Sequence, residues 1–185
     1  MRQKTEVSVS VGAVLLLSAL WFFFDTVTFL ALLAAALIHE TGHLAALSFF
    51  GCRIAGFRAD MSGAMICGAG SLTPMEELCS LAAGPALGMI YALMASAAGN
   101  ALGSSFLLKS AGISLLLSVF NLLPTQPLDG GRLLAILWDN PRACAAISFA
   151  VSFLLLGCGL FLMAKGMGLG LLIAGIWLMI AQAAL

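Results

Sequence analysis

Charged side chains are scarce in this sequence. Its 185 residues include 8 Lys or Arg and 8 Asp or Glu, so only 9% carry a charge and the formal net charge is zero. About a quarter of the residues in a soluble domain are charged, so the scarcity excludes a soluble domain. The zero net charge carries no information about partners, because a bilayer limits charged residues. No nucleic acid is expected as a partner. With 62% hydrophobic residues, the chain is predicted to be an integral membrane protein, surrounded by a lipid bilayer.

Paired cysteines are also missing. The sequence has five cysteines, an odd number, and none of them forms a CxxC motif. This pattern argues against a disulfide framework. We interpret the cysteines as small apolar residues: Cys52, Cys67, Cys79, Cys144 and Cys158.

Long apolar runs fill most of the chain. A membrane-spanning helix needs about 20 mostly apolar residues, and the sequence holds six such runs. It therefore predicts an all-α polytopic membrane protein with about six transmembrane helices, built as a single domain over residues 1–185. The first run resembles a signal peptide, but residues 21–24 offer no small-residue cleavage site, which favours a retained helix. The predicted spans cover residues 9–24, 28–50, 74–98, 106–123, 143–163 and 169–185.

The segment after the second span has a different character. Residues 51–73 are rich in glycine and carry Arg53, Arg58 and Asp60. Short apolar runs flank a plausible turn at residues 60–63. This predicts a small β-hairpin or irregular segment at the membrane surface. We also hypothesise that it offers a strand edge on which an extended peptide can lie, and that proline near Phe57 would disturb this binding.

The distribution of cations indicates the orientation of the chain. Cytoplasmic loops carry an excess of Lys and Arg. Placing the N-terminus in the cytoplasm puts most of the cationic residues inside and leaves two outside. The inside group is Arg2, Lys4, Arg53, Arg58, Arg132 and Arg142, and the outside pair is Lys109 and Lys165.

The only two histidines of the chain lie four residues apart in the second run, as His39-Glu40-Thr-Gly-His43. On a helix, residues i and i+4 lie about 40° apart around the axis and about 6 Å apart along it, so both imidazoles share a face. Such a pair can bind zinc, and this motif on a helix is typical of metalloproteases. Glu40 points about 100° away from His39 and is predicted to act as the general base. The alternatives are an interhelical hydrogen bond for histidine and a proton-carrying role for Glu40.

Two imidazoles do not complete a catalytic zinc site, which usually has three protein ligands and a water molecule. Several acids and the cysteines are candidates for the third ligand. Most of the acids lie at span ends, where capping or solvation explains them. Asp129 lies in a proline- and glycine-broken segment, and irregular backbone at membrane depth is found where it is buried or lines a cavity. A turn or N-cap role explains Asp129 equally well. The acidic candidates are Asp25, Asp60, Glu76, Glu77, Asp129 and Asp139.

The order of these motifs resembles the site-2 protease family of intramembrane zinc metalloproteases. The resemblance rests on the histidine motif in a membrane helix and, about eighty residues later, on the run Asn121-Leu-Leu-Pro-Thr-Gln-Pro-Leu-Asp129-Gly-Gly. A helix with Ala83-Gly-Pro lies between them and is a weaker signal. In layout the chain is most similar to the sporulation branch, which processes a membrane-tethered pro-sigma factor.

This resemblance implies a zinc ion bound by His39, His43 and Asp129, with Glu40 activating water and Asn121 orienting substrate or stabilising the oxyanion. It implies regulated intramembrane proteolysis of a membrane-tethered protein substrate, with a regulatory membrane protein as a further partner. The expected location is the bacterial cytoplasmic membrane, with the active site toward the cytoplasm. No PDZ or CBS domain is expected. Two alternatives remain, a metal or proton transporter and a non-proteolytic membrane scaffold.

Overall fold

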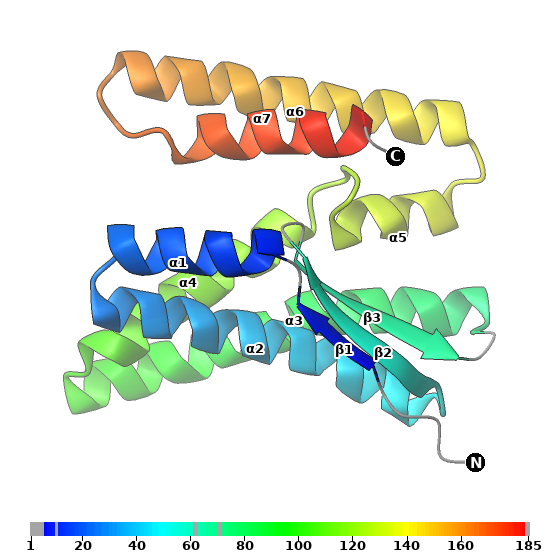
Figure 1. The fold of residues 1–185 in the computed structure, drawn as a ribbon, viewed down its shortest axis with the longest axis horizontal. Helices are drawn as coiled ribbons and strands as arrows, with labels where there is room; N and C mark the ends of the chain where they lie inside the picture. Colours follow the sequence, from blue (N-terminus) through cyan, green and yellow to red (C-terminus); the bar gives the residue numbers. More distant parts are fainter. Residues whose placement is uncertain (1–5, 10, 61–62, 70–71, 184–185) are drawn as a thin grey trace. The chain divides into compact units, whose positions relative to one another are not determined.

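The computed structural model describes residues 6–9, 11–60, 63–69 and 72–183. The chain divides into two compact units, Met1–Val119 and Phe120–Leu185, which are considered in turn. The prediction of a single domain over 1–185 stays a prediction. The elements appear in Figure 1 and follow the order β1 (Glu6–Val9), α1 (Val11–Phe23), α2 (Thr26–Phe49), β2 (Arg53–Asp60), β3 (Gly63–Ala69), α3 (Pro74–Leu102), α4 (Ser105–Asn121), α5 (Asp129–Leu137), α6 (Pro141–Ala164) and α7 (Gly170–Ala183).

The first unit is organised around α2 and α3. Helix α2 begins after Asp25, whose carboxylate accepts a hydrogen bond from the backbone N–H of Thr28, as an N-cap does. Helix α3 begins with the capping box that Thr73 and Glu76 form, so the helix start predicted at Pro74 is confirmed. The buried residues of α2 recur at helical spacing and are Ala31, Ala35, His39 and Gly42.

Small residues let α3 approach its neighbours closely. Its buried positions include Ser80, Gly84, Gly88 and Ala92, one every fourth residue. Such stripes are typical of helix contacts inside membranes. A Cβ atom added to Gly42 would lie 2.8 Å from the Cα atom of Gly84, so α2 and α3 are in backbone contact at this point. This contact holds α3 against the face of α2 that carries both histidines.

The strands form one sheet in the order β1-β2-β3. Strands β2 and β3 pair antiparallel, in the segment for which the sequence predicted a hairpin or an irregular stretch, and β1 pairs parallel with β2. Strand β1 was not predicted from the sequence, because residue 9 was expected to begin a transmembrane span. The strand forms by pairing with β2, about fifty residues further along the chain. A local sequence pattern does not predict such a long-range contact.

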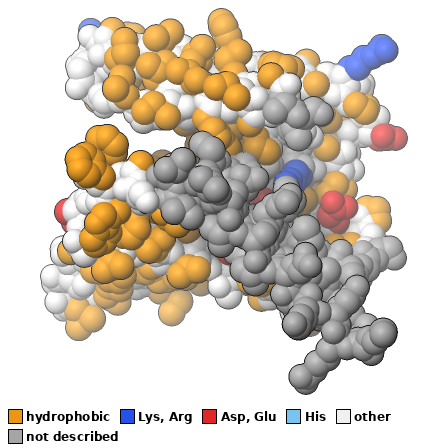
Figure 2. Space-filling view, in the orientation of Figure 1, with side chains coloured by type: hydrophobic (Ala, Val, Ile, Leu, Met, Phe, Trp, Pro, Cys, Tyr) orange, Lys and Arg blue, Asp and Glu red, His pale blue; other side chains and the backbone are white. Residues whose placement is uncertain are grey.

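Three helices of the described residues are long and apolar enough to cross a membrane, namely α2, α3 and α6. Large apolar side chains are exposed on all three, and hydrophobic atoms cover much of the surface drawn in Figure 2. These features agree with a membrane protein. Helices α1, α4 and α7 have 13, 17 and 14 residues, which is at or below the length of a typical span. The prediction of six spans is therefore not confirmed.

The second unit contains the end of α4 and the three last helices. Helices α6 and α7 lie side by side (Figure 1), and a Cβ on Gly159 or Gly175 would overlap the backbone of the facing helix. The fourth span was predicted to end at residue 123, and α4 ends at Asn121. Asp129 was predicted to lie in the broken segment, but it is the first residue of α5. Gly130 and Gly131 lie inside this helix and are buried.

The cysteines agree with the sequence interpretation as far as they are described. Cys52, Cys79, Cys144 and Cys158 are free thiols. Cys67 lies on β3, where side chains are outside the described residues.

Candidate metal site

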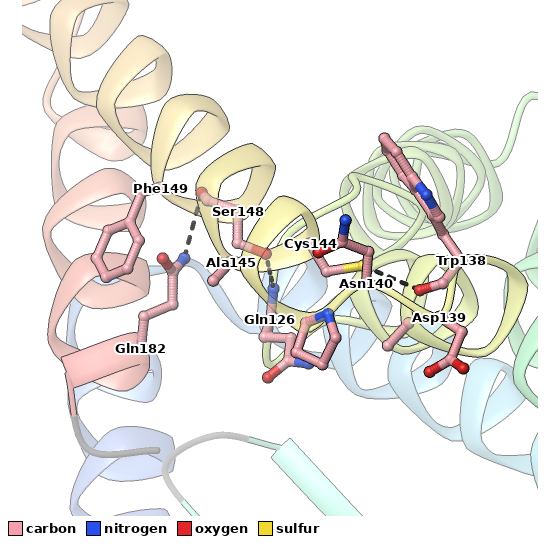
Figure 3. A pocket seen from close by; sticks show the side chains of 11 residues that line it. Gln126, Trp138, Asp139, Asn140, Cys144, Ala145, Ser148, Phe149 and Gln182 are labelled. Carbon is pink, nitrogen blue, oxygen red and sulfur yellow. Dashed lines mark hydrogen bonds between the residues drawn. The ribbon is translucent and has the colours of Figure 1, made fainter.

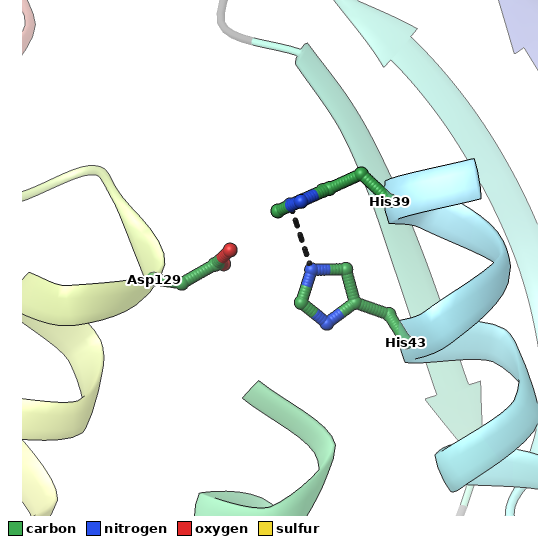
Figure 4. A group of neighbouring side chains, drawn as sticks. All are labelled: His39, His43 and Asp129. Atoms are coloured by element: carbon green, nitrogen blue, oxygen red, sulfur yellow. Dashed lines mark hydrogen bonds between the residues drawn. The ribbon is translucent and has the colours of Figure 1, made fainter. Parts of the chain in front are cut away.

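The two histidines lie together on one face of α2, as predicted from their spacing. Their Nε2 atoms are 3.2 Å apart, and the rings stand nearly perpendicular to each other, with an interplanar angle of 78°. Figure 4 shows both rings pointing away from α2 in the same direction. His39 is 4% exposed. A pair of imidazoles with converging Nε2 atoms, one buried and one partly buried, is thus formed within a single helix.

A backbone carbonyl orients the second histidine. The Nδ1 atom of His43 lies 2.8 Å from the carbonyl oxygen of Ser80 on α3. Because a carbonyl only accepts hydrogen bonds, Nδ1 carries a proton, which leaves Nε2 as the nitrogen that can bind a metal. Metal-binding histidines are commonly held in this way by the nitrogen that does not bind the metal. This partner could not be predicted from the sequence, since every residue has a carbonyl.

The geometry of the pair fits a zinc ion. Two nitrogens bound to one tetrahedral zinc at about 2.0–2.1 Å would lie about 3.4 Å apart, close to the 3.2 Å between the Nε2 atoms. Zinc accepts imidazole nitrogens together with carboxylate oxygens. The histidine pair therefore passes the test of donor type and spacing.

Glycine at position 84 keeps the place beside His43 open. A Cβ added to Gly84 would overlap the imidazole of His43, with the Nε2 atom as its nearest neighbour. Any side chain here would push the ring out of its position. The Ala83-Gly84-Pro85 run was a weak family signal in the sequence. The space that His43 needs explains the glycine in it.

Asp129 belongs to the second unit and is the first residue of α5. The sequence left an N-cap role open for it, but the N-cap residue is Leu128. Asp129 is partly buried and lies in the first turn of the helix. Its side chain projects from this turn in Figure 4. Asp129 thus offers carboxylate oxygens at the start of α5.

The other predicted site residues lie on the expected elements. Glu40 follows His39 on α2 and is partly buried, and Asn121 is the last residue of α4 and is partly buried as well. Their predicted roles in catalysis stay predictions.

Two of the remaining acids have structural roles, as expected for acids at span ends. Asp25 caps α2 and forms an ion pair with Lys109 at 3.0 Å. Hydrogen bonds from the side chain and backbone of Thr28, followed by one from Lys109, lower the pKa of Asp25 below its ordinary value. Glu76 completes the capping box of α3. Glu77 and Asp139 are exposed, and the side chain of Asp60 is outside the described residues.

No protein-family model matches the chain, and no curated protein sequence matches it either. A comparison with solved structures finds the site-2 protease from Methanocaldococcus jannaschii, with a TM-score of 0.73 and 21% sequence identity. The match covers 100% of this chain and 93% of that one. The chain therefore has the fold of a site-2 protease.

Proposed function

We propose that this chain is an intramembrane zinc metalloprotease of the site-2 protease family. It would hydrolyse a peptide bond within or near the transmembrane segment of a membrane-tethered protein. The observation that carries the proposal is the convergence of the Nε2 atoms of His39 and His43 at 3.2 Å on an apolar helix long enough to span a membrane. Buried imidazoles are costly in a membrane and mark functional sites there.

Asp129 is the proposed third ligand. His39, His43 and Asp129 offer two nitrogens and one oxygen, a donor set that could hold a metal ion. Three protein ligands leave one coordination position for water or substrate, as catalytic zinc sites do. A carboxylate also offsets part of the positive charge of the ion, which lowers the cost of holding it within a membrane protein.

The proposed chemistry divides between the metal and the chain. Zinc, when bound, supplies a Lewis acid that polarises the substrate carbonyl and makes water a better nucleophile. Glu40 accepts a proton from the attacking water while the water oxygen forms a bond to the carbonyl carbon. When the C–N bond breaks, Glu40 gives this proton to the leaving amine. The Asn121 amide is proposed to donate a hydrogen bond to the substrate, either to orient it or to stabilise the oxyanion.

A transmembrane substrate has to expose its backbone before it can be cleaved, because its amides are hydrogen-bonded within a helix. We propose that the cleaved segment lies in extended form on an edge of the sheet. Phe57, which the sequence analysis placed at this edge, lies on the central strand β2 and pairs with Val7 and with Ile66. Among the described strands, the outer edges therefore belong to β1 and β3.

The cellular setting is proposed from the cation distribution. The cytoplasmic membrane of a bacterium, with the site toward the cytoplasm, places most Arg and Lys residues inside. A further membrane protein is proposed to regulate the enzyme. The span count of six is part of this proposal.

The test is co-expression with a single-pass membrane protein as candidate substrate, comparing the unaltered chain with Glu40→Gln. This variant keeps both histidines and removes the general base, so cleavage should fall at least about 100-fold, while bound zinc, measured by atomic absorption on purified protein, should stay the same. The variant His39→Ala should lose both cleavage and bound zinc.

Other outcomes would point to the alternatives. Equal cleavage by the Glu40→Gln variant, with zinc bound in both proteins, would remove the protease claim. Metal or proton flux in proteoliposomes without cleavage would indicate a transporter. A Glu40→Gln strain without any phenotype would indicate a scaffold.

A further inference from the structure

A buried polar cluster joins the loop before Asp129 to α6 and α7. Thr125 is fully buried, although it lies in an irregular segment. Its hydroxyl lies 3.2 Å from the backbone carbonyl of Ser148 and 3.1 Å from the hydroxyl of Ser152. The side-chain amide of Gln182, near the end of α7, donates to Thr125 Oγ1 at 2.7 Å and to Ser152 Oγ at 2.6 Å.

The next residue of the loop is attached to the same helix. The backbone N–H of Gln126 donates to Ser148 Oγ at 3.3 Å. Figure 3 shows this bond and the approach of the Gln182 amide to Ser148. Two successive loop residues are therefore hydrogen-bonded to one turn of α6, and α7 supplies the amide that completes the cluster.

The first turn of α5 rests directly on this loop. A Cβ on Gly131 would overlap the backbone of Thr125 and Gln126, and a Cβ on Gly130 would overlap the backbone of Leu122 and Leu123. The loop and the start of α5 are thus in backbone contact. A displacement of Thr125 would move the helix turn that begins with Asp129.

Packing alone does not fix this part of the unit. A cavity of about 390 Å³ lies beside the cluster and is lined by Gln126, Ala135 and Trp138 on one side and by residues of α6 and α7 on the other. Close packing normally holds side chains and helices in one position. Where a cavity takes its place, directional hydrogen bonds have to hold the loop.

We infer that Gln182 and Thr125 are positioning residues that hold the carboxylate of Asp129 in place for metal binding. This inference rests on the proposed function, because it takes Asp129 as a zinc ligand. Neither side chain acts on the metal or the substrate itself. Leucine at position 182 would fill a similar volume in an otherwise apolar helix, so the amide is needed for its hydrogen bonds. Residues that orient a metal ligand typically change metal affinity or activity 10–100-fold when they are replaced.

The test compares substitutions of similar shape in the full-length protein in detergent. Thr125→Val removes the hydroxyl and keeps the shape, Thr125→Ser keeps the hydroxyl, and Gln182→Leu removes the amide. Tyr91→Phe is the matched control, since it removes a hydrogen bond between α3 and α4, from Tyr91 to Ser110 at 2.8 Å. Zinc affinity is measured by competition with a chelator, ligand geometry by the visible absorption of bound Co²⁺, and stability by thermal unfolding.

We expect Thr125→Val and Gln182→Leu to bind zinc at least about 10-fold more weakly and to alter the Co²⁺ spectrum. Thr125→Ser and Tyr91→Phe should bind zinc as the unaltered protein does. The double variant Thr125→Val/Gln182→Leu should lose little more zinc affinity than either single variant, because both substitutions remove the hydrogen bond between Gln182 and Thr125. Unchanged zinc affinity and an unchanged spectrum in Thr125→Val and Gln182→Leu would overturn the inference, whatever happens to the melting temperature.

Asp129→Ala separates the two proposals. If Asp129→Ala weakens zinc binding and Thr125→Val does not, only the positioning role is wrong. If Asp129→Ala binds zinc as tightly as the unaltered protein, Asp129 is not a ligand. The proposed three-ligand site and the positioning role of Thr125 and Gln182 are then both wrong. If either positioning variant does not fold, the other one and the Thr125→Ser rescue still decide the question.

Discussion

At the scale of single residues, position 84 requires glycine, because the absence of a side chain leaves room for the His43 ring. Gly84→Ala would place a methyl group against the Nε2 atom of His43. We expect zinc affinity to fall at least about 10-fold and cleavage to fall with it. Zinc titration of the purified variant measures the effect.

The matched control for Gly84→Ala is Gly157→Ala on α6, where an added Cβ has nothing within 4 Å. This change should leave zinc binding intact and raise the stability slightly, since it restricts the unfolded chain. If Gly84→Ala binds zinc as tightly as Gly157→Ala does, the His43 ring does not need the space that Gly84 leaves.

The residues of the proposed metal site differ in how far the sequence could predict them. His39 and His43 were predictable, because a helix brings residues at this spacing together whatever the fold. Asp129 was not predictable from the residues alone, since a third ligand depends on the tertiary structure, and only the family resemblance selected it. The Ser80 carbonyl has no sequence signal. The cluster around Gln182 did have one, namely an amide in an apolar run near the end of the sequence, and it was missed.

At the scale of elements, the sheet gives the substrate-binding proposal a sharper test than the one drawn from the sequence. Proline at Phe57 would break pairing inside the sheet, because β2 is bonded on both sides. On β3, which is bonded to β2, successive N–H groups alternate between pointing toward β2 and pointing away from it. Proline removes the backbone N–H of its position. In one of the two neighbouring variants Met65→Pro and Ile66→Pro, the lost N–H points away from β2, so that variant keeps the hydrogen bonds within the sheet.

We expect the variant that spares the sheet to reduce cleavage by about 10-fold or more, comparable to the loss of one or two backbone hydrogen bonds to the substrate, without changing zinc content. Zinc analysis and the co-expression assay give the two readings. Full cleavage by both proline variants would show that the substrate does not use the edge of β3.

The elements also show where local patterns stop being informative. The helix starts at Pro74 and Pro141 follow from proline and capping residues that lie next to each other in the sequence. The strand β1 does not, because residues 6–9 become a strand by pairing with β2. For the same reason α1 begins later than the predicted span and is shorter.

At the scale of the whole molecule, the orientation in the membrane can be tested on α6. This helix has 24 residues, or about 36 Å at 1.5 Å per residue, which is enough to cross a hydrocarbon core of about 30 Å. Arg142 lies at its start and Lys165 at its end. The positive-inside rule places Arg142 in the cytoplasm. In a variant without native cysteines, Lys165→Cys should react with a membrane-impermeant maleimide in intact cells, and Arg142→Cys should react only after lysis.

The reverse labelling pattern would invert the proposed orientation. Labelling of both positions in intact cells would mean that α6 does not span the membrane.

The hydrogen bond from His43 to the carbonyl oxygen of Ser80 has a consequence for genetics. The acceptor is part of the main chain, so every amino acid at position 80 supplies it. A library of all substitutions at this buried position should tolerate small residues such as alanine and glycine, and would therefore score it as a site that only limits size. The importance of the oxygen would become visible only if the backbone itself were altered, for example by an ester in place of the amide that follows Ser80, which weakens the carbonyl as an acceptor. The atom that orients the proposed metal ligand His43 can thus be protected from side-chain mutation altogether.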